Sequence, residues 1–235
     1  FGQCADMDPI RELAAKHGIK IMEDGAQSIG SKYKGRTCGN LGDVATLSFF
    51  PSKNLGGWGD AGMILTQDDG LAEQMGKMRL HGGSKQYFHD FVGTNSRLDT
   101  LQAAVLLAKL PFLPGWSAAR LEKAQAYTAR FKSCPAVVPP AIDLANRHIF
   151  HQYTIRAERR DALMTHLKAR GIGCAVYYPL GLHLQPCFAH LGYQPGSLPV
   201  TERAMAEVIS LPVYPELTEP QMDAVVSAIT DFYGS

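Results

Sequence analysis

The sequence has little net charge, few cysteines and no long hydrophobic run. Its formal net charge is +1 and no long basic stretch occurs, so nothing favours nucleic acid or an anionic membrane surface as a partner. The longest apolar stretches, residues 44–51 and 103–107, are far too short to cross a bilayer. No secretory signal is visible. We therefore expect a cytoplasmic protein.

The cysteine content also limits the possible classes of site. The chain has an odd number of cysteines and no C-x-x-C pair; its five cysteines are Cys4, Cys38, Cys134, Cys174 and Cys187. This pattern favours neither a disulfide framework nor a cysteine zinc site. Among the histidines, His148 and His151 are three residues apart, but no carboxylate is close to them in sequence. We therefore expect no metal site.

The first half of the chain alternates between predicted strands and helices. Hydrophobic residues make up 46% of the 235 residues, enough for one large or two small domains. Asp8 and Pro9 predict the cap and first residue of a helix that Gly18 ends. The segments expected to be strands are residues 19–22, 44–50 and 61–66, and a further helix is expected over residues 70–80. Because the second strand is apolar almost throughout, we expect it to be buried on both faces of a layered α/β domain.

The second half has a different character. A helix is expected from residue 99 to 110, interrupted by Pro111 and Pro114, with a second helix over residues 117–131. A proline-rich junction at residues 134–143 follows. Beyond it we expect strands at 152–157 and 174–178, a helix at 161–170, and a last helix opened by a capping box at Thr218. The predicted division is a large α/β domain over residues 1–114 and a smaller α+β domain with a linking helix over 115–235.

A lysine, a carboxylate, an amide and a hydroxyl follow or end two of these strands. Asp24 and Gln27 follow the first predicted strand, Ser48 ends the second, and Lys53 lies between Pro51 and a glycine-rich turn. A lysine can form a Schiff base with pyridoxal phosphate, a carboxylate can hold its ring nitrogen protonated, and a hydroxyl can reach its phosphate. Taken singly, Asp24 is typical of a turn and Ser48 of a buried strand. Lys53 is the least ordinary of the set, because lysines are mostly solvated surface residues.

Several motifs follow one another in a fixed order. They are E-D-x-A-Q with Asp24, G-x-L-G-D, S-F-F-P-S-K-N-L with Lys53, G-x-N-S-R-L-D with Asn95, H-x-x-x-Q-Y, Y-Y-P and L-P-V-Y-P. With these motifs the chain resembles, essentially end to end, the DegT/DnrJ/EryC1/StrS family of pyridoxal-phosphate-dependent sugar aminotransferases. The resemblance implies a fold-type-I aminotransferase, normally a homodimer with active sites at the subunit interface.

The resemblance also implies roles for particular residues around the cofactor. Lys53 would be the Schiff-base lysine and Asp24 would bind the pyridine nitrogen. Gln27 would contact the cofactor and Ser48 its phosphate. Asn95 would reach the phosphate of the cofactor in the neighbouring subunit.

The implied substrates are a nucleotide-linked keto sugar and glutamate as the amino donor, with an amino sugar as the product. Arg97 would lie near the sugar-nucleotide end of the site. Tyr177, Tyr178 and His183 fall in a region that often lines the substrate pocket. For these last three residues, aromatic packing within the small domain is an equal alternative.

Other functions stay open. Relatives in this family usually carry a further N-terminal segment before the point where this chain begins at Phe1, so we expect the large domain to be only partly represented. A branch acting on cyclitols or aminohydroxybenzoate precursors is compatible with the sequence. A truncated, non-catalytic protein that binds pyridoxal phosphate or has a regulatory role is a further alternative. The dehydratase branch replaces the lysine with histidine, and Lys53 argues against it.

Overall fold

The computed structural model describes residues 1–234, and their contacts divide the chain into two compact units. The first, which we call the N-terminal unit, comprises Gly2–Ala118 and Ile142–His151. The second, the C-terminal unit, comprises Phe1, Ala119–Ala141 and the residues from Gln152 onward. None of the helices in this described part combines the length and hydrophobicity needed to span a membrane.

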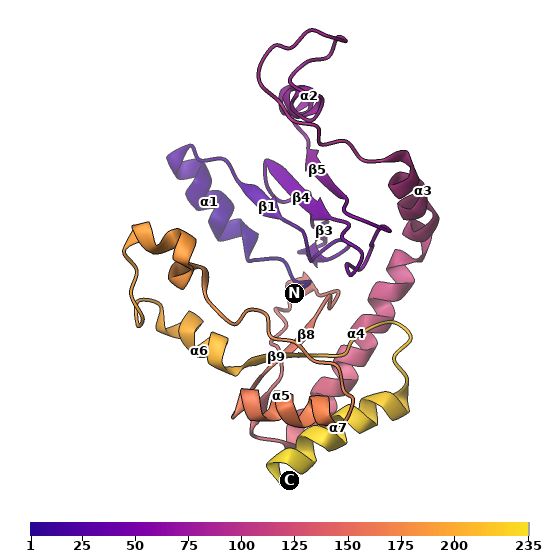
Figure 1. Cartoon of the computed structure of the whole chain (residues 1–235), viewed down its shortest axis with the longest axis vertical. Helices are drawn as coiled ribbons and strands as arrows, with labels where there is room; N and C mark the ends of the chain where they lie inside the picture. The colour runs from indigo at the N-terminus through magenta and orange to yellow at the C-terminus, as the bar shows by residue number, and fades with distance from the viewer. Residues whose placement is uncertain (235) are drawn as a thin grey trace. The chain divides into compact units, whose positions relative to one another are not determined.

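The N-terminal unit is built on a mixed three-stranded sheet. Its strands are β1 (Met22–Asp24), β4 (Val44–Ser48) and β5 (Gly62–Thr66), in the spatial order β1-β4-β5. β1 is parallel to β4, and β5 is antiparallel to it. Figure 1 shows α1 alongside β1 and α2 beyond the far end of β5. The helices of this unit are α1 (Met7–His17), α2 (Asp69–Met78) and α3 (Thr100–Lys109).

The beginning of α1 differs slightly from the prediction. Asp6, not Asp8, is the N-cap residue, although Gly18 ends the helix in the left-handed conformation as expected. The Asp8 carboxylate instead accepts hydrogen bonds from Lys34 and Arg36, each at 2.7 Å. Pro9 is tolerated within the first turn because proline lacks a backbone N–H, and N–H groups in the first turn have no acceptor within the helix.

The first predicted strand, over residues 19–22 and finishing at Glu23 and Asp24, is confirmed only in part, since β1 begins at Met22 and ends at Asp24. Two N–H groups of the preceding residues have partners outside the sheet, although Ile21 O accepts from Val44 N of β4 at 3.2 Å. Ile19 N donates to Ala14 O at the end of α1, and Ile21 N donates to the Asp43 carboxylate at 2.8 Å. Groups bonded in this way are not available to extend the strand.

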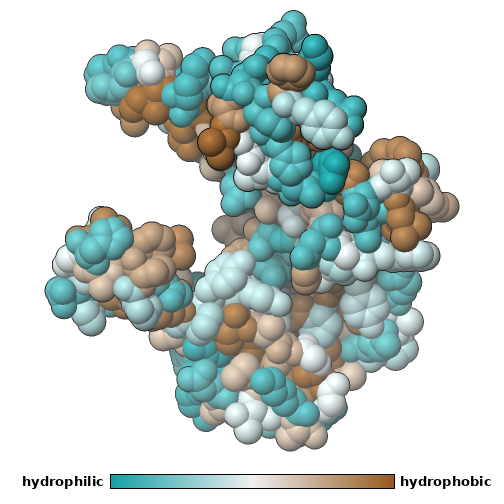
Figure 2. Space-filling model, turned by 45° about the horizontal axis from the view of Figure 1, so that its top comes forward, coloured by the Kyte–Doolittle hydropathy of each residue, from teal (hydrophilic) through white to brown (hydrophobic). Residues whose placement is uncertain are grey.

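The expectation that the central strand is buried on both faces is also wrong. In β4 only Ala45 is buried, and the other residues are half-buried. The adjacent strands are exposed as well: Met22 of β1 and Ile64 of β5 expose 71% and 55% of their surface. Figure 2 shows hydrophobic residues at several places on the surface. Large exposed side chains of this kind also occur on α1 and α3, namely Ile10, Leu13, Leu101 and Leu107.

A second, antiparallel sheet in the N-terminal unit was not predicted. It consists of β2 (Lys32–Tyr33), β3 (Arg36–Thr37) and β7 (Asn146–Arg147), in the order β3-β2-β7. Lys34 and Gly35 both have positive φ, as a two-residue hairpin turn requires. The pairing with β7 links the first part of the chain to the segment Ile142–His151.

The junction after α3 confirms the break at Pro111 but not the one at Pro114. A short 3₁₀ helix, Leu110–Phe112, separates α3 from α4 (Leu113–Arg130). Pro114 lies in the first turn of α4, where its missing N–H costs nothing, so that helix begins before the predicted residue 117.

The C-terminal unit has an antiparallel sheet covered by helices. Its strands are β6 (Val137–Val138), β8 (Tyr153–Ala157) and β9 (Val208–Leu211), in the order β6-β8-β9. α5 and α7 lie side by side in Figure 1, and Tyr127 of α4 stacks on Tyr153 of β8 with ring centroids 5.2 Å apart. The longer helices are α5 (Arg160–Ala169), α6 (Pro199–Glu207) and α7 (Glu219–Tyr233), and the 3₁₀ turns are Phe131–Ser133, Leu182–Leu184 and Pro186–Leu191.

Two predictions for this unit have opposite outcomes. The strand expected at residues 174–178 is wrong, because only Ala175 forms an isolated bridge, to Ser210 of β9. The capping box is confirmed. Thr218 Oγ1 accepts from Gln221 N, and the Gln221 side chain accepts from Thr218 N at 2.9 Å.

Candidate active site

The carboxyl ends of β1 and β4 meet at one edge of the N-terminal sheet. Asp24 is the last residue of β1 and pairs in register with Thr46, and β4 continues for two residues to Ser48. Ser48 is opposite Gly62, where β5 begins. This parallel register explains how residues that are distant in sequence contribute to one edge, which is the usual location of ligands in open α/β sheets.

Asp24 presents its carboxylate at this edge. The side chain is exposed, and Oδ1 accepts a hydrogen bond from Ala26 N at 3.0 Å. The backbone behind it is tightly packed: a Cβ on Gly25 would lie 2.9 Å from both Thr46 O and Cys38 Sγ. The turn is therefore fixed by close backbone packing, and it orients the carboxylate that precedes it. Gln27 lies within the turn that follows and is half-buried.

Lys53 lies in a loop whose two ends are anchored in a hydrophobic cluster. Phe49 and Leu55, on either side of it, are buried together with Leu106 of α3 and Leu113 of α4. Lys53 N donates to Phe50 O at 2.9 Å, and the lysine is half-buried. Anchoring both ends limits the positions that the lysine amine can reach.

At the start of this loop, Ser48 Oγ accepts from Phe50 N at 3.3 Å. A hydroxyl that accepts from the backbone keeps its own hydrogen for donation to another acceptor. Such a group suits an anion at the edge of the sheet.

The glycine-rich turn after Lys53 is packed too closely for side chains. A Cβ on Gly56 would lie 2.3 Å from Pro51 O, and Gly57 N donates to Phe49 O at 2.8 Å. Two side chains of α3 hold the turn from outside. Gln102 Oε1 accepts from Trp58 N at 2.7 Å, and Lys109 Nζ donates to Gly56 O.

Asn54 and His151 support the same loop, and sequence reasoning did not single out this pair. Asn54 is buried, and its Nδ2 donates to Ile149 O at 3.4 Å. Its Oδ1 lies 3.0 Å from His151 Nδ1. The only sequence signal was that Asn54 follows Lys53 directly in the S-K-N motif.

Asn95 and Arg97 are brought together with each other but are not placed beside Asp24 and Ser48. Arg97 Nε donates to Asn95 Oδ1 at 2.9 Å, and both side chains are exposed. Asn95 also bridges Leu80, directly after α2. β5 begins opposite Ser48 and runs away from that edge toward α2. Asn95 and Arg97 belong to the segment that follows α2, beyond the far end of β5 (Figure 1).

The three remaining predicted residues belong to the C-terminal unit. Tyr177 and Tyr178 have ring centroids 5.6 Å apart and line a mostly apolar pocket of about 370 Å³ with Leu182 and Met205. His183 is buried and pairs instead with Glu202, with Nε2 and Oε1 3.2 Å apart.

Glu202 fixes the segment around His183. Its carboxylate accepts from Gly196 N and Leu198 N as well as from His183. These hydrogen bonds, led by the one from Gly196, hold the pKa of Glu202 below its usual value. His183 therefore contributes to the shape of this region through Glu202, whereas the two tyrosines face the pocket.

Comparison with known proteins gives consistent matches over nearly the whole chain. The model of the DegT/DnrJ/EryC1/StrS aminotransferase family matches residues 1–230. The pleiotropic regulatory protein of Geobacillus stearothermophilus is 50% identical over 99% of this chain, and dTDP-3-amino-3,4,6-trideoxy-alpha-D-glucose transaminase of Streptomyces venezuelae is 42% identical, also over 99%. The chain spans 63% and 61% of the length of these two relatives.

A solved structure agrees with these matches. The crystal structure of a DegT DnrJ EryC1 StrS aminotransferase from Brucella abortus has a TM-score of 0.92 at 40% identity, covering 98% of this chain and 62% of that one. The expected α/β fold of a pyridoxal-phosphate-dependent aminotransferase is thereby confirmed.

Proposed function

We propose, from the premise that this chain belongs to the DegT/DnrJ/EryC1/StrS aminotransferase family, that it carries part of a pyridoxal-phosphate-dependent sugar aminotransferase. The observation that carries the proposal is the sheet edge at which Asp24 and Ser48 lie, followed by the anchored loop of Lys53. Residues 1–114 would represent the large cofactor-binding domain, with Ile142–His151 packed on it, and residues 115–235 the small domain.

The donor set of this edge fits pyridoxal phosphate. An exposed carboxylate, a hydroxyl and a primary amine match the ring nitrogen, the phosphate and the aldehyde of that cofactor. The family's aminotransferases depend on it. When bound, it supplies the carbonyl that takes up the amino group and the electron sink that stabilises the resulting carbanion.

The chain's own residues supply attachment and proton transfer. Lys53 Nζ would be the attachment point and then the general base that takes the proton from the α-carbon of the amino donor. Asp24 would keep a proton on the ring nitrogen, because an opposite charge nearby favours the protonated form. Ser48 and Gln27 would hold the phosphate and the ring, and the Asn54, Gln102 and Lys109 contacts keep the lysine loop in place.

The proposed substrates are a nucleotide-linked keto sugar and glutamate. One relative is named as a dTDP-amino-sugar transaminase, which supports this substrate class. We assign Arg97 to the sugar-nucleotide end, and Tyr177 and Tyr178 to the substrate pocket. His183 would position this region through Glu202.

We further propose a cytoplasmic homodimer with shared active sites. Arg97 and Asn95 lie away from the Lys53 edge of the sheet, which is compatible with their serving the partner subunit. Exposed Leu101 and Leu107 on α3 supply apolar surface of the kind that subunit contacts use.

A regulatory, non-catalytic function is a second candidate. The relative with 50% identity is named as a pleiotropic regulatory protein. A regulatory protein that only binds the cofactor would show no glutamate-dependent change in absorbance. Amination of a cyclitol or an aminohydroxybenzoate precursor would show that change but would not use a keto-sugar nucleotide.

The experiment uses full-length protein with a panel of keto-sugar nucleotides and glutamate. The wild type should bind pyridoxal phosphate, lose its visible absorbance with glutamate and show ping-pong kinetics. Lys53→Ala should lose turnover by a factor of about 10²–10⁴ or more. Lys16→Ala, at an exposed position of α1, is the matched control and should behave as wild type. Full turnover in Lys53→Ala would refute the assignment.

A further inference from the structure

Two thiols and a carboxylate form a buried group that the proposed aminotransferase reaction does not use. Cys4 precedes α1, Glu23 lies in β1, and Cys38 follows β3. Their ligating atoms all lie within 4.8 Å of one another. Cys4 and Cys38 expose only 9% and 7% of their surface. The fold therefore brings together three side chains from segments up to 34 residues apart. The two cysteines do not form a C-x-x-C pair, so the sequence pattern does not indicate the group.

Glu23 is held in a fixed orientation at this group. Its Oε2 accepts from Gly39 N at 2.8 Å and from Leu41 N at 3.2 Å. Among residues 1–234 no lysine, arginine or histidine forms an ion pair with this carboxylate. Carboxylates that bind metal ions are themselves held by hydrogen bonds, so this orientation is compatible with Glu23 serving as a ligand.

The two thiols are themselves embedded in a polar environment. Ser31 Oγ lies 3.2 Å from Cys4 Sγ, and Ser28 Oγ lies 3.0 Å from Cys38 Sγ. Each sulfur therefore lies beside a buried hydroxyl and within 4.8 Å of the other sulfur and of the Glu23 carboxylate.

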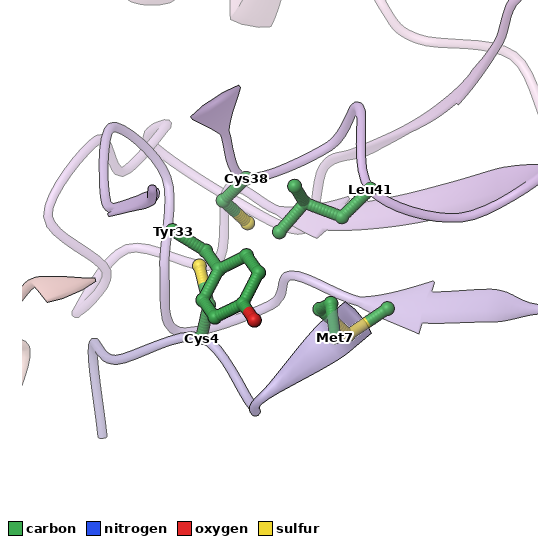
Figure 3. Close-up of a cluster of buried hydrophobic side chains, with 5 residues drawn as sticks. All are labelled: Cys4, Met7, Tyr33, Cys38 and Leu41. Carbon is green, nitrogen blue, oxygen red and sulfur yellow. The ribbon is translucent and has the colours of Figure 1, made fainter. Parts of the chain in front are cut away.

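The simplest alternative is that both cysteines only fill the hydrophobic core. They do pack with Met7, Tyr33 and Leu41, as Figure 3 shows. Core packing explains two small apolar side chains, and the N–H groups of Gly39 and Leu41 explain the orientation of Glu23. Neither explains why the carboxylate and two buried hydroxyls lie beside the same two sulfurs.

We propose that Cys4, Cys38 and Glu23 form a binding site for a thiophilic divalent cation such as Zn²⁺. Two thiolates and one carboxylate are a ligand set that zinc accepts, with a fourth position left for water or a hydroxyl. Binding would release the thiol protons and involves no change in oxidation state. The bound ion would link the residues before α1, strand β1 and the turn before β4, and so would stabilise this part of the fold.

The site is separate from the one proposed for the cofactor. Glu23 and Asp24 are successive residues of β1, so their side chains point to opposite faces of the sheet. The inference therefore does not depend on the proposed function, and its test measures metal binding and stability.

Cd²⁺, a spectroscopic substitute for Zn²⁺, is titrated into full-length, metal-free, reduced protein while thiolate-to-metal absorbance is followed. We expect one ion per chain, loss of this signal in Cys4→Ser and in Cys38→Ser, and at least about tenfold weaker binding in Glu23→Gln. Cys187→Ser, at an exposed cysteine, is the matched control and should retain the signal. Absence of the band in wild type, or its persistence in the Cys4→Ser/Cys38→Ser double variant, would overturn the proposal.

A second measurement needs no variant and covers the case in which the serine variants do not fold. Wild-type protein is alkylated in mild denaturant with and without Zn²⁺, and each cysteine is quantified by peptide mapping. Zn²⁺ should slow alkylation of Cys4 and Cys38 at least tenfold more than that of buried Cys134, and should raise the melting temperature. Equal protection of all three cysteines, or none, would overturn the proposal.

Discussion

His151 Nδ1 donates a hydrogen bond to Asn54 Oδ1 across 3.0 Å, although the two residues are 97 positions apart. The roles of donor and acceptor follow from the orientation of the Asn54 amide. Its Nδ2 donates to Ile149 O, so the atom that faces His151 is Oδ1, which can only accept. Asn54 is thus attached at both ends to the segment Ile142–His151. It is also the residue next to Lys53, so the contact holds the lysine loop in place.

Replacing either partner should loosen this loop. We expect Asn54→Ala to lower the free energy of unfolding by about 1–3 kcal/mol, because it removes the hydrogen bonds that the buried amide makes with Ile149 O and with the His151 ring. Cofactor affinity should fall as well, while Lys53 itself is intact. Urea unfolding and a pyridoxal phosphate titration measure the two effects.

A double-mutant cycle tests whether the pair acts as a unit. The double variant Asn54→Ala/His151→Ala should be less destabilised than the sum of the single variants, with a coupling energy of about 0.5–3 kcal/mol. Asn40→Ala, at an exposed position of the same unit, should be nearly neutral. Strict additivity of the two single variants would mean that the contact carries no energy.

Gly56 should not tolerate even one added methyl group. Its Cβ would lie 2.3 Å from Pro51 O, which is backbone and cannot rotate away. We expect Gly56→Ala to destabilise the protein by about 1–3 kcal/mol and to displace the Lys53 loop. Gly76→Ala is the matched control. Nothing lies within 4 Å of that position in α2, so the substitution should be neutral or stabilising. Equal stabilities of the two variants would contradict the steric argument.

The part of the site that could be predicted from sequence is local. Asp24, Ser48 and Lys53 each follow or end an apolar strand, and parallel pairing of β1 with β4 was enough to bring the first two to one edge. The contacts of Gln102 and Lys109 with the glycine turn could not be predicted in the same way. They depend on how α3 packs against that turn, and no periodicity in the sequence encodes that register.

Errors in the fold have a similar origin. Residues 19–21 have the composition of a strand, but Ile19 N donates to the end of α1 and Ile21 N donates to Asp43. The two-residue strands β2, β3 and β7 are too short to produce any alternation of apolar and polar residues. The capping box of α7 was predictable because it needs only Thr218 and Gln221, three residues apart.

Glu202 should control the order of the segment between His183 and Leu198. Three donors converge on its carboxylate, from Gly196, Leu198 and His183, so Glu202→Ala leaves all three without an acceptor. We expect faster amide hydrogen exchange at Gly196 and Leu198, measured by mass spectrometry. Since the pKa of Glu202 is lowered in the folded state, its contribution is present at neutral pH and is lost as the pH falls through that lowered pKa. The exposed Glu122→Ala is the control, and unchanged exchange in Glu202→Ala would refute the assignment.

His148 should make the stability of the protein fall in mildly acidic solution. The imidazole is buried and stacked on Phe150 with centroids 3.7 Å apart, and its Nδ1 accepts from Phe150 N at 2.9 Å. Burial lowers the pKa of His148 to about 4, against about 6.5 for an unperturbed histidine. Between these two values the unfolded chain binds a proton that the folded chain does not, so stability decreases as the pH falls from about 6.5 to about 4.

The size of this effect should be about 3 kcal/mol over that interval, with no contribution above it. His148→Asn keeps an acceptor for Phe150 N but cannot titrate, so its free energy of unfolding should depend less on pH by that amount. Urea unfolding of both proteins at several pH values measures the difference, and His17→Asn, at an exposed position of α1, should keep the wild-type dependence. A buried neutral imidazole would make the free energy of unfolding of wild type fall more steeply with decreasing pH than that of His148→Asn. If the two proteins instead lose stability in parallel between pH 6.5 and 4, protonation of other groups causes the loss.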